Sequence, residues 1–156
     1  MIKKIAVVLF LLISTTLIAQ NSEENNSSKN SMKKKKLSEK NLVVFVSNEN
    51  LQVVGMGFGI ALSGVKQGAN VTVVVGANAL KYLLREGKQN VYFAKQKTPR
   101  ELAKNIIKEG GSIQLCSANT EEMNLDEDDF IDGVKLVIST EIFAKVFEKN
   151  SQVISF

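Results

Sequence analysis

The chain has 156 residues, of which 44% are hydrophobic, and it carries a formal net charge of +4 with neither histidine nor tryptophan. Without histidine, Ser-His-Asp and Cys-His catalytic arrangements are excluded within this chain. Its single cysteine cannot supply the ligands of a structural zinc site of the Cys/His type. We therefore expect one domain that holds no metal and no cofactor.

Residues 1–19 have the pattern of a secretory signal peptide. Lys3 and Lys4 form a short basic start, and no charged residue follows up to Ala19. A basic start, an apolar segment of this length and a small residue at its end are typical of an export signal, here cleaved after Ala19. The pattern predicts an exported, periplasmic protein. An uncleaved signal that anchors the protein to the membrane is the alternative, because the residues before Ala19 match the cleavage pattern imperfectly.

Residues 20–40 are polar and basic. They predict a disordered linker, because a segment with so few apolar side chains cannot offset its ordering entropy. The linker contains four consecutive lysines, Lys33, Lys34, Lys35 and Lys36. These lysines are interpreted either as part of a solvated tether or as a weak contact with an anionic membrane surface.

The excess positive charge lies outside the predicted domain. Residues 1–19 carry a net charge of +2, residues 20–40 carry +3, and residues 41–156 carry −1. A nucleic-acid-binding domain needs a basic face on the fold itself. We therefore expect no nucleic acid partner for this chain.

From residue 41 onward, short apolar runs rich in β-branched residues alternate with helical patterns. The predicted strands cover residues 42–46, 71–75, 113–116, 134–138 and 153–156. The predicted helices cover residues 51–66, 77–85, 99–109 and 140–148, and the third follows a capping box formed by Thr98 and Glu101. Residues 91–94 predict a short strand or an extended connection. The alternation predicts an α/β fold of three layers (α/β/α), flavodoxin-like, with about five mainly parallel strands.

The only cysteine, Cys116, ends the predicted strand 113–116 and precedes the small residues Ser117, Ala118 and Asn119. Ligands bind at the carboxyl ends of the strands in open α/β sheets, so this pattern predicts a thiol at a ligand-binding edge. Asn119 is the expected cap of a short helix. In an exported protein, a lone cysteine has no intramolecular disulfide partner. Cys116 is therefore interpreted either as a functional thiol or as a small buried hydrophobic residue.

Ser47 and Asn48 follow the first predicted strand, so they belong to the same edge of the sheet as Cys116. They are expected either to line a pocket there or to form a polar turn before the next helix. That helix contains Gly55, Gly59 and Ser63 at a spacing of four residues, which predicts a smooth face for the sheet or a neighbouring subunit. A dinucleotide fingerprint is not formed here, because its third glycine is missing.

The predicted domain resembles the DsrE/DsrF-like family, small α/β proteins of sulfur metabolism that are related to the sulfur-relay subunits of tRNA thiolation. The resemblance covers residues 42–156 and rests on the runs QGANVTVVV and PRELAKNIIKEGGSIQLCSANTEEMNLDEDDFIDGVKLV. Its most specific part runs from Gly110 to Val137, where a strand ends in cysteine and an acidic segment leads to the next strand. We therefore expect residues 41–156 to form a DsrE-like domain.

The resemblance implies that Cys116 takes up sulfur as a persulfide and passes it on, which makes the chain at most a sulfur carrier or sulfurtransferase-like protein. It also implies a homo-oligomer, a trimer or a hexamer, and a sulfur-donor protein as partner. Relatives often have a basic residue and a glycine shortly after the cysteine, whereas this chain has Glu121 and Glu122. Support for a thiolate is therefore expected from the amino-terminal end of the following helix. The alternative is a non-catalytic binding or assembly module with a buried structural cysteine.

The acidic segment after Cys116 does not predict a metal site. Four consecutive carboxylates occupy residues 126–129. A calcium-binding EF-hand loop needs alternating oxygen ligands, a glycine at its sixth position and a glutamate at its twelfth, and this spacing is absent. The segment is interpreted as the acidic first turn of a short helix, where the helix dipole favours negative charge.

Overall fold

The computed structural model describes residues 37–92 and 94–156 of the chain. The expected signal peptide, residues 1–19, and the lysine run of residues 33–36 lie outside these described residues. The described residues belong to one compact unit, Leu37–Phe156. Within the described part of the chain, none of the helices combines the length and the apolar character needed to span a membrane.

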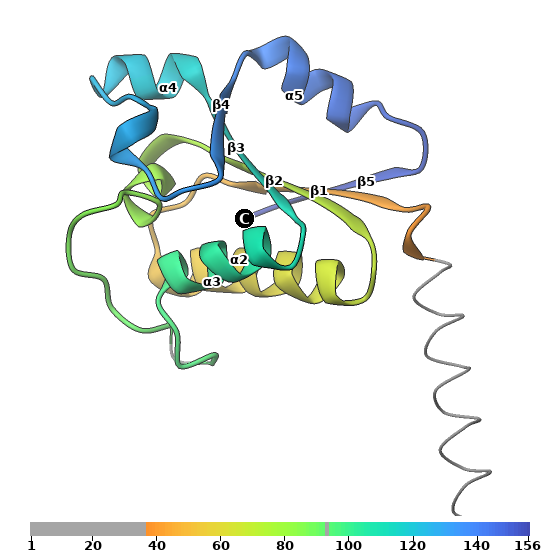
Figure 1. The fold of residues 1–156 in the computed structure, drawn as a ribbon, viewed down its shortest axis with the longest axis horizontal. Coiled ribbons are helices and arrows are strands. Elements are labelled where there is room, and N and C mark those ends of the chain that lie inside the picture. The colour runs from red at the N-terminus through yellow and green to blue at the C-terminus, as the bar shows by residue number, and fades with distance from the viewer. Residues whose placement is uncertain (1–36, 93) are drawn as a thin grey trace, which may run out of the picture. The chain divides into compact units, whose positions relative to one another are not determined.

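Five strands form one all-parallel sheet in the order β4-β3-β2-β1-β5 (Figure 1). The strands are β1 (Asn41–Val46), β2 (Asn70–Val75), β3 (Ser112–Cys116), β4 (Val134–Val137) and β5 (Ser151–Ser155). Their apolar runs reflect a sheet with helices on both faces, which leaves the central strands no polar side. The three-layer, flavodoxin-like α/β fold predicted from the sequence is confirmed.

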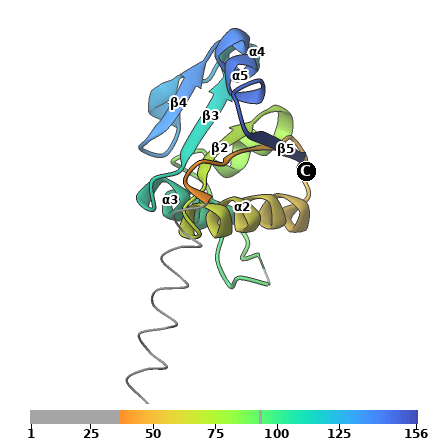
Figure 2. The same cartoon turned by 90° about the vertical axis from the view of Figure 1, so that its right-hand side faces the viewer.

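Two helices, α2 (Leu51–Lys66) and α3 (Pro99–Lys108), cover one face of the sheet (Figures 1 and 2). The largest side chain of this layer, Phe58 of α2, is completely buried in the main core. The Asn50 side chain caps α2 by accepting hydrogen bonds from the backbone N–H groups of Gln52 and Val53. These contacts fix α2 across the sheet directly after β1 ends.

The capping box at the start of α3 is present as predicted. The Thr98 hydroxyl accepts a hydrogen bond from the Glu101 N–H, and the Glu101 carboxylate accepts one from the Thr98 N–H at 2.7 Å. The Thr98 backbone hydrogen bond lowers the pKa of Glu101, with a further contribution from the Thr98 hydroxyl. The ionised carboxylate therefore stabilises the start of this helix above the ordinary pKa of glutamate, and this contribution is lost as the pH falls through the lowered value.

The other face of the sheet carries α5 (Ser139–Val146), together with the short helix α4 (Ser117–Glu122) at its edge (Figure 2). Ile142 of α5 packs with Val43, Val74 and Val137 in a second, smaller core cluster. The outer side of α5 is not covered, since Phe143 is 60% exposed and Phe147 is 77% exposed. The two faces of the sheet are thus unequally covered.

One predicted helix differs from the structure. Residues 77–85 were expected to form a helix, but only the short 3-10 helix η1 (Ala77–Tyr82) is present, starting at a left-handed Ala77 (φ 47°) without a side-chain cap. For residues 91–94, a short strand or an extended connection was expected, and Tyr92 pairs only with the nearby Lys97 in an isolated bridge, which agrees with a connection. The segment between η1 and α3 is therefore a connection that folds locally.

This connection also explains the small residues of α2. A Cβ atom placed on Gly55 would overlap the ring of Tyr92, and one on Gly59 would lie 3.6 Å from Cε of Lys95. The expectation that this helix face meets the sheet is therefore wrong at Gly55 and Gly59. The face receives the connection that precedes α3.

The domain begins before the predicted boundary at residue 41. The carbonyl oxygens of Ser38 and Lys40 accept hydrogen bonds from Asn70, at 3.1 Å from Nδ2 and 3.0 Å from the backbone nitrogen. The Glu39 carbonyl accepts one from Nδ2 of Asn150 at 3.3 Å. The last residues of the predicted linker are therefore hydrogen-bonded to the first residue of β2 and to the residue before β5.

Candidate functional site

Cys116 is the last residue of β3 and the amino-terminal cap residue of α4, as its place in the sequence predicted. Its side chain is half-buried and forms no disulfide. The Sγ atom lies 3.9 Å from the Oγ atom of Ser139, the first residue of α5, and either atom can be the donor. The thiol therefore lies where the ends of β3 and β4 meet the start of two helices.

The alternation of β3 places Cys116 on the face of the sheet that α5 covers. Ile113 and Leu115 point into the main core, so Gln114 and Cys116 share the opposite face. Cys116 packs there against the smaller cluster that contains Val74 and Val137. The thiol thus has an apolar cluster on one side and the open edge of the sheet on the other.

The predicted neighbours Ser117, Ala118 and Asn119 all lie in α4. Asn119 does not cap this helix as expected, because Cys116 occupies the cap position. Instead, Oδ1 of Asn119 accepts a hydrogen bond from the N–H of Ala77 at 3.3 Å. Asn119 therefore ties the turn after Cys116 to the strained turn that ends β2.

Ser47 and Asn48 lie at the same edge of the sheet, but β2 separates their strand from β3. The Ser47 N–H donates to the carbonyl of Phe156 at 3.0 Å, and Oδ1 of Asn48 accepts from the N–H of Asn50 at 2.8 Å. Among the described residues, no hydrogen bond joins either of them to Cys116. Their contacts are those of a polar turn that leads into α2.

The charged surroundings of Cys116 differ from the sequence-based expectation. The helix α4 has only six residues, so few aligned peptide dipoles stand behind Cys116. Lys135 of β4 provides a cation that the sequence reasoning missed. It is in register with Gln114 and lies on the same sheet face as Cys116, one residue pair away. Such diagonal neighbours on adjacent strands are within reach of a long side chain.

Gln114 is the second residue that the sequence reasoning missed. Its side chain is only 8% exposed, and its Oε1 atom has no hydrogen-bond partner among the described residues. A buried acceptor without a donor is unfavourable, and such groups are frequent at functional sites. The signal was present in the sequence, because Gln114 interrupts an otherwise apolar strand two residues before the cysteine.

Replacing Gln114 by leucine is expected to increase the free energy of unfolding by about 1–2 kcal/mol, because the substitution removes a buried acceptor that lacks a donor. Urea unfolding of the two proteins measures the difference. The matched control is Gln52→Leu, an exposed position of α2, which should change the stability by less than about 0.5 kcal/mol. A clear loss of stability in Gln114→Leu would show that the amide has a favourable partner in solution.

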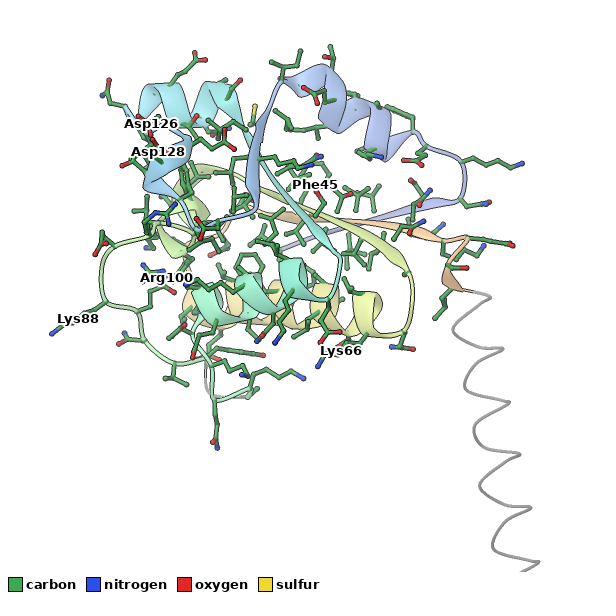
Figure 3. The ribbon with its side chains drawn as sticks, viewed as in Figure 1. Phe45, Lys66, Lys88, Arg100, Asp126 and Asp128 are labelled. Atoms are coloured by element: carbon green, nitrogen blue, oxygen red, sulfur yellow. The ribbon has the colours of Figure 1, made fainter. Side chains whose placement is uncertain are left out.

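An apolar groove adjoins the thiol site. It has a volume of about 400 Å³ and runs between α5 and the sheet, and its lining consists of Phe45, Ser139, Ile142, Phe143, Val146 and Val153. Figure 3 shows Phe45 on the sheet beneath α5. Ser139 belongs to both the groove and the contact with Cys116. The groove therefore provides an uncharged surface next to the thiol.

The acidic segment forms a local turn in the structure. Asp126 caps the 3-10 helix η2 (Glu127–Asp129) by accepting a hydrogen bond from the N–H of Asp128, and Figure 3 shows both aspartates at the surface. Within residues 37–92 and 94–156, no group of three His, Cys, Asp or Glu side chains is suited to hold a metal ion. The carboxylates of this segment cap backbone groups and face solvent.

The fold and the exposed strand edge define a small α/β protein with a half-buried thiol at its carboxyl edge. Three solved structures share this fold. They are the ychN protein from E. coli (14% identity, TM-score 0.65), the MTH1491 protein of unknown function from Methanobacterium thermoautotrophicum (13%, 0.61) and the conserved BT1422 protein of unknown function from Bacteroides thetaiotaomicron (12%, 0.58).

The alignments with these structures cover 75–77% of this chain and 97–99% of theirs, so each matches the folded part of this protein over nearly its whole length. At these identities the likeness establishes the fold alone. Comparisons with protein families and with curated proteins find no match.

Proposed function

We propose that this protein binds and relays sulfur, carrying it as a persulfide on Cys116. The observation that carries the proposal is the placement of the only thiol, half-buried and without a disulfide partner, at the carboxyl edge of a parallel sheet. The shared fold and the sequence resemblance to the DsrE/DsrF-like family support it. The activity proposed for the protein is therefore the exchange of sulfur between Cys116 and a partner.

The proposed step is an exchange at sulfur. The thiolate of Cys116 attacks the outer sulfur of a donor persulfide, a new Sγ–S bond forms, and the S–S bond of the donor breaks. The donor leaves as a thiolate, and its persulfide proton stays with the transferred sulfur. No net oxidation occurs, so the step needs no cofactor.

The proposal includes export to the periplasm, a sulfur-donor protein as partner and assembly into a homo-oligomer. In an oxidising compartment an accessible thiol is prone to oxidation, so a sulfur cycle or a reducing partner has to protect it. The exposed aromatic pair of α5 is the surface that we assign to assembly, because large apolar side chains on a helix surface commonly mark contacts between proteins.

Intact-mass spectrometry of the protein before and after treatment with polysulfide tests the proposal. We expect a gain of about 32 Da for each added sulfur atom, reversed by a reductant and absent in Cys116→Ala. A parallel measurement follows labelling of the native and the unfolded protein by iodoacetamide. If the mass never increases and Cys116 reacts only after unfolding, the thiol is a core residue. The alternative of a non-catalytic assembly module would then stand.

A further inference from the structure

A second cavity lies between the amino-terminal ends of α2 and α3. Its volume is about 330 Å³, which is within the range of small-molecule sites, and Cys116 is not among its lining residues. Leu51, Tyr82 and Leu84 contribute apolar surface to it. Three cationic side chains, Lys81, Lys88 and Arg100, line the same cavity, against the single carboxylate of Glu86.

Arg100 is the centre of this cavity. Its guanidinium donates hydrogen bonds to the carbonyl oxygens of Glu86 at 2.5 Å and Gly87 at 3.0 Å. Its Nε atom is buried and has no acceptor among the described residues. The ion pairs of the described residues join Lys81 to Glu49, Arg85 to Asp132 and Lys145 to Glu148, so none of them neutralises Arg100. A half-buried charge and a buried donor are therefore left uncompensated.

Holding the connecting segment in place does not explain why residue 100 carries a charge. Gln89 already holds the same segment, since its Nε2 atom donates to the carbonyl of Tyr82 at 2.9 Å and its Oε1 atom accepts from the Arg100 N–H at 3.0 Å. A neutral donor would serve the two carbonyl groups equally well. A guanidinium is suited to planar oxyanions, which accept two parallel hydrogen bonds from it.

The two lysines strengthen the positive potential of the cavity. Nζ of Lys81 lies 5.4 Å from the centre of the Tyr82 ring and 3.4 Å from a carboxylate oxygen of Glu49. Lys88 extends outward from the connecting segment, whereas Arg100 reaches toward that segment from the start of α3 (Figure 3). The cavity thus combines a half-buried cation, Arg100, with an outer cation that attracts anions from solution.

We propose that this cavity binds a small organic oxyanion, a carboxylate or a phosphate ester. Its anionic group contacts Arg100, and its uncharged body lies against Leu51, Tyr82 and Leu84. The proposal does not depend on the chemistry of Cys116.

The side-chain Nε–H signals of the two arginines, Arg85 and Arg100, allow a direct test by NMR of the ¹⁵N-labelled full chain. Phenyl phosphate, benzoate and the uncharged phenol are the probes. We expect phenyl phosphate or benzoate to shift the Arg100 signal in a saturable way. The Arg85 signal should stay in place, because Arg85 Nε already donates to the carbonyl of Asp128 at 3.2 Å. Tighter binding of one probe identifies the phosphate ester or the carboxylate as the ligand.

Variants test the same site by calorimetry. Arg100→Gln should weaken binding at least about tenfold, while Lys104→Gln, which removes a charge from an exposed position of the same helix, should leave it unchanged. Lys81→Gln keeps the hydrogen bonds of Arg100 to the connecting segment and should weaken binding severalfold. This second variant therefore tests the proposal even when Arg100→Gln fails to fold. Equal shifts of both arginine signals, equal binding of phenol, or no saturable shift would overturn the proposal.

Discussion

Replacing Phe58 by alanine is expected to lower the free energy of unfolding by about 3–5 kcal/mol. Phe58 is fully buried between α2 and the sheet, and it is among the largest side chains of the main core. The substitution removes its apolar contacts and leaves a cavity that the flanking parallel strands can close only in part. A domain has a total stability of about 5–15 kcal/mol, so the variant should lie close to its unfolding threshold at room temperature.

Urea unfolding followed by circular dichroism measures this loss. The control is Met56→Ala, which shortens a large apolar side chain of the same helix at a position that is 46% exposed. We expect this control to change the stability by less than about 0.5 kcal/mol. Comparable losses in the two variants would mean that helix propensity or assembly, and not burial against the sheet, determines the contribution of α2.

If the protein forms the proposed homo-oligomer through α5, the double substitution of Phe143 and Phe147 by glutamate is expected to convert it into monomers. The two rings stack with a centroid distance of 6.0 Å on the open side of α5. Covering one phenylalanine side chain at an interface contributes about 1.5–3 kcal/mol, and two such rings recur in every subunit of a closed assembly. Glutamate removes this contribution and places like charges against each other.

Size-exclusion chromatography with light scattering gives the mass of each variant. Met56→Glu with Ile60→Glu is the matched control, since these two side chains have the same spacing on α2 and are 46% and 40% exposed. The control should keep the mass of the unaltered protein. If only the α2 variant becomes monomeric, the interface lies on the face of the sheet that α2 covers. A monomeric unaltered protein would contradict the proposed assembly.

The sequence predicted β1 and β2 well because both consist mainly of apolar, β-branched residues, whose burial on two faces leaves little alternative. It also placed Cys116 correctly, since the change from apolar to small polar residues marks the end of β3. The helix expected over residues 77–85 was wrong because its start depends on the left-handed Ala77 and its contact with Asn119. Such a contact between distant segments has no local signal.

Two features of the candidate sites depend on strand register and on loop packing, which the sequence does not display. Lys135 neighbours the thiol only because β4 pairs with β3 in one particular register. Arg100 carries no signal of its own in the sequence, since the cavity beside it forms only when the connection from η1 folds back. The resemblance to a family directed attention to Cys116 and away from this cavity.

The position of β1 in the sheet has a consequence for the order in which the domain can form. Asn41 of β1 pairs with Ser151 of β5, whereas the other neighbour of β1, β2, starts only a few residues after α2. During synthesis one edge of β1 therefore stays open until β5 has emerged. An unpaired, apolar strand edge is a template for pairing with other chains. The pairing of β5 thus covers this edge of β1, and the remaining edges of the sheet belong to β4 and β5.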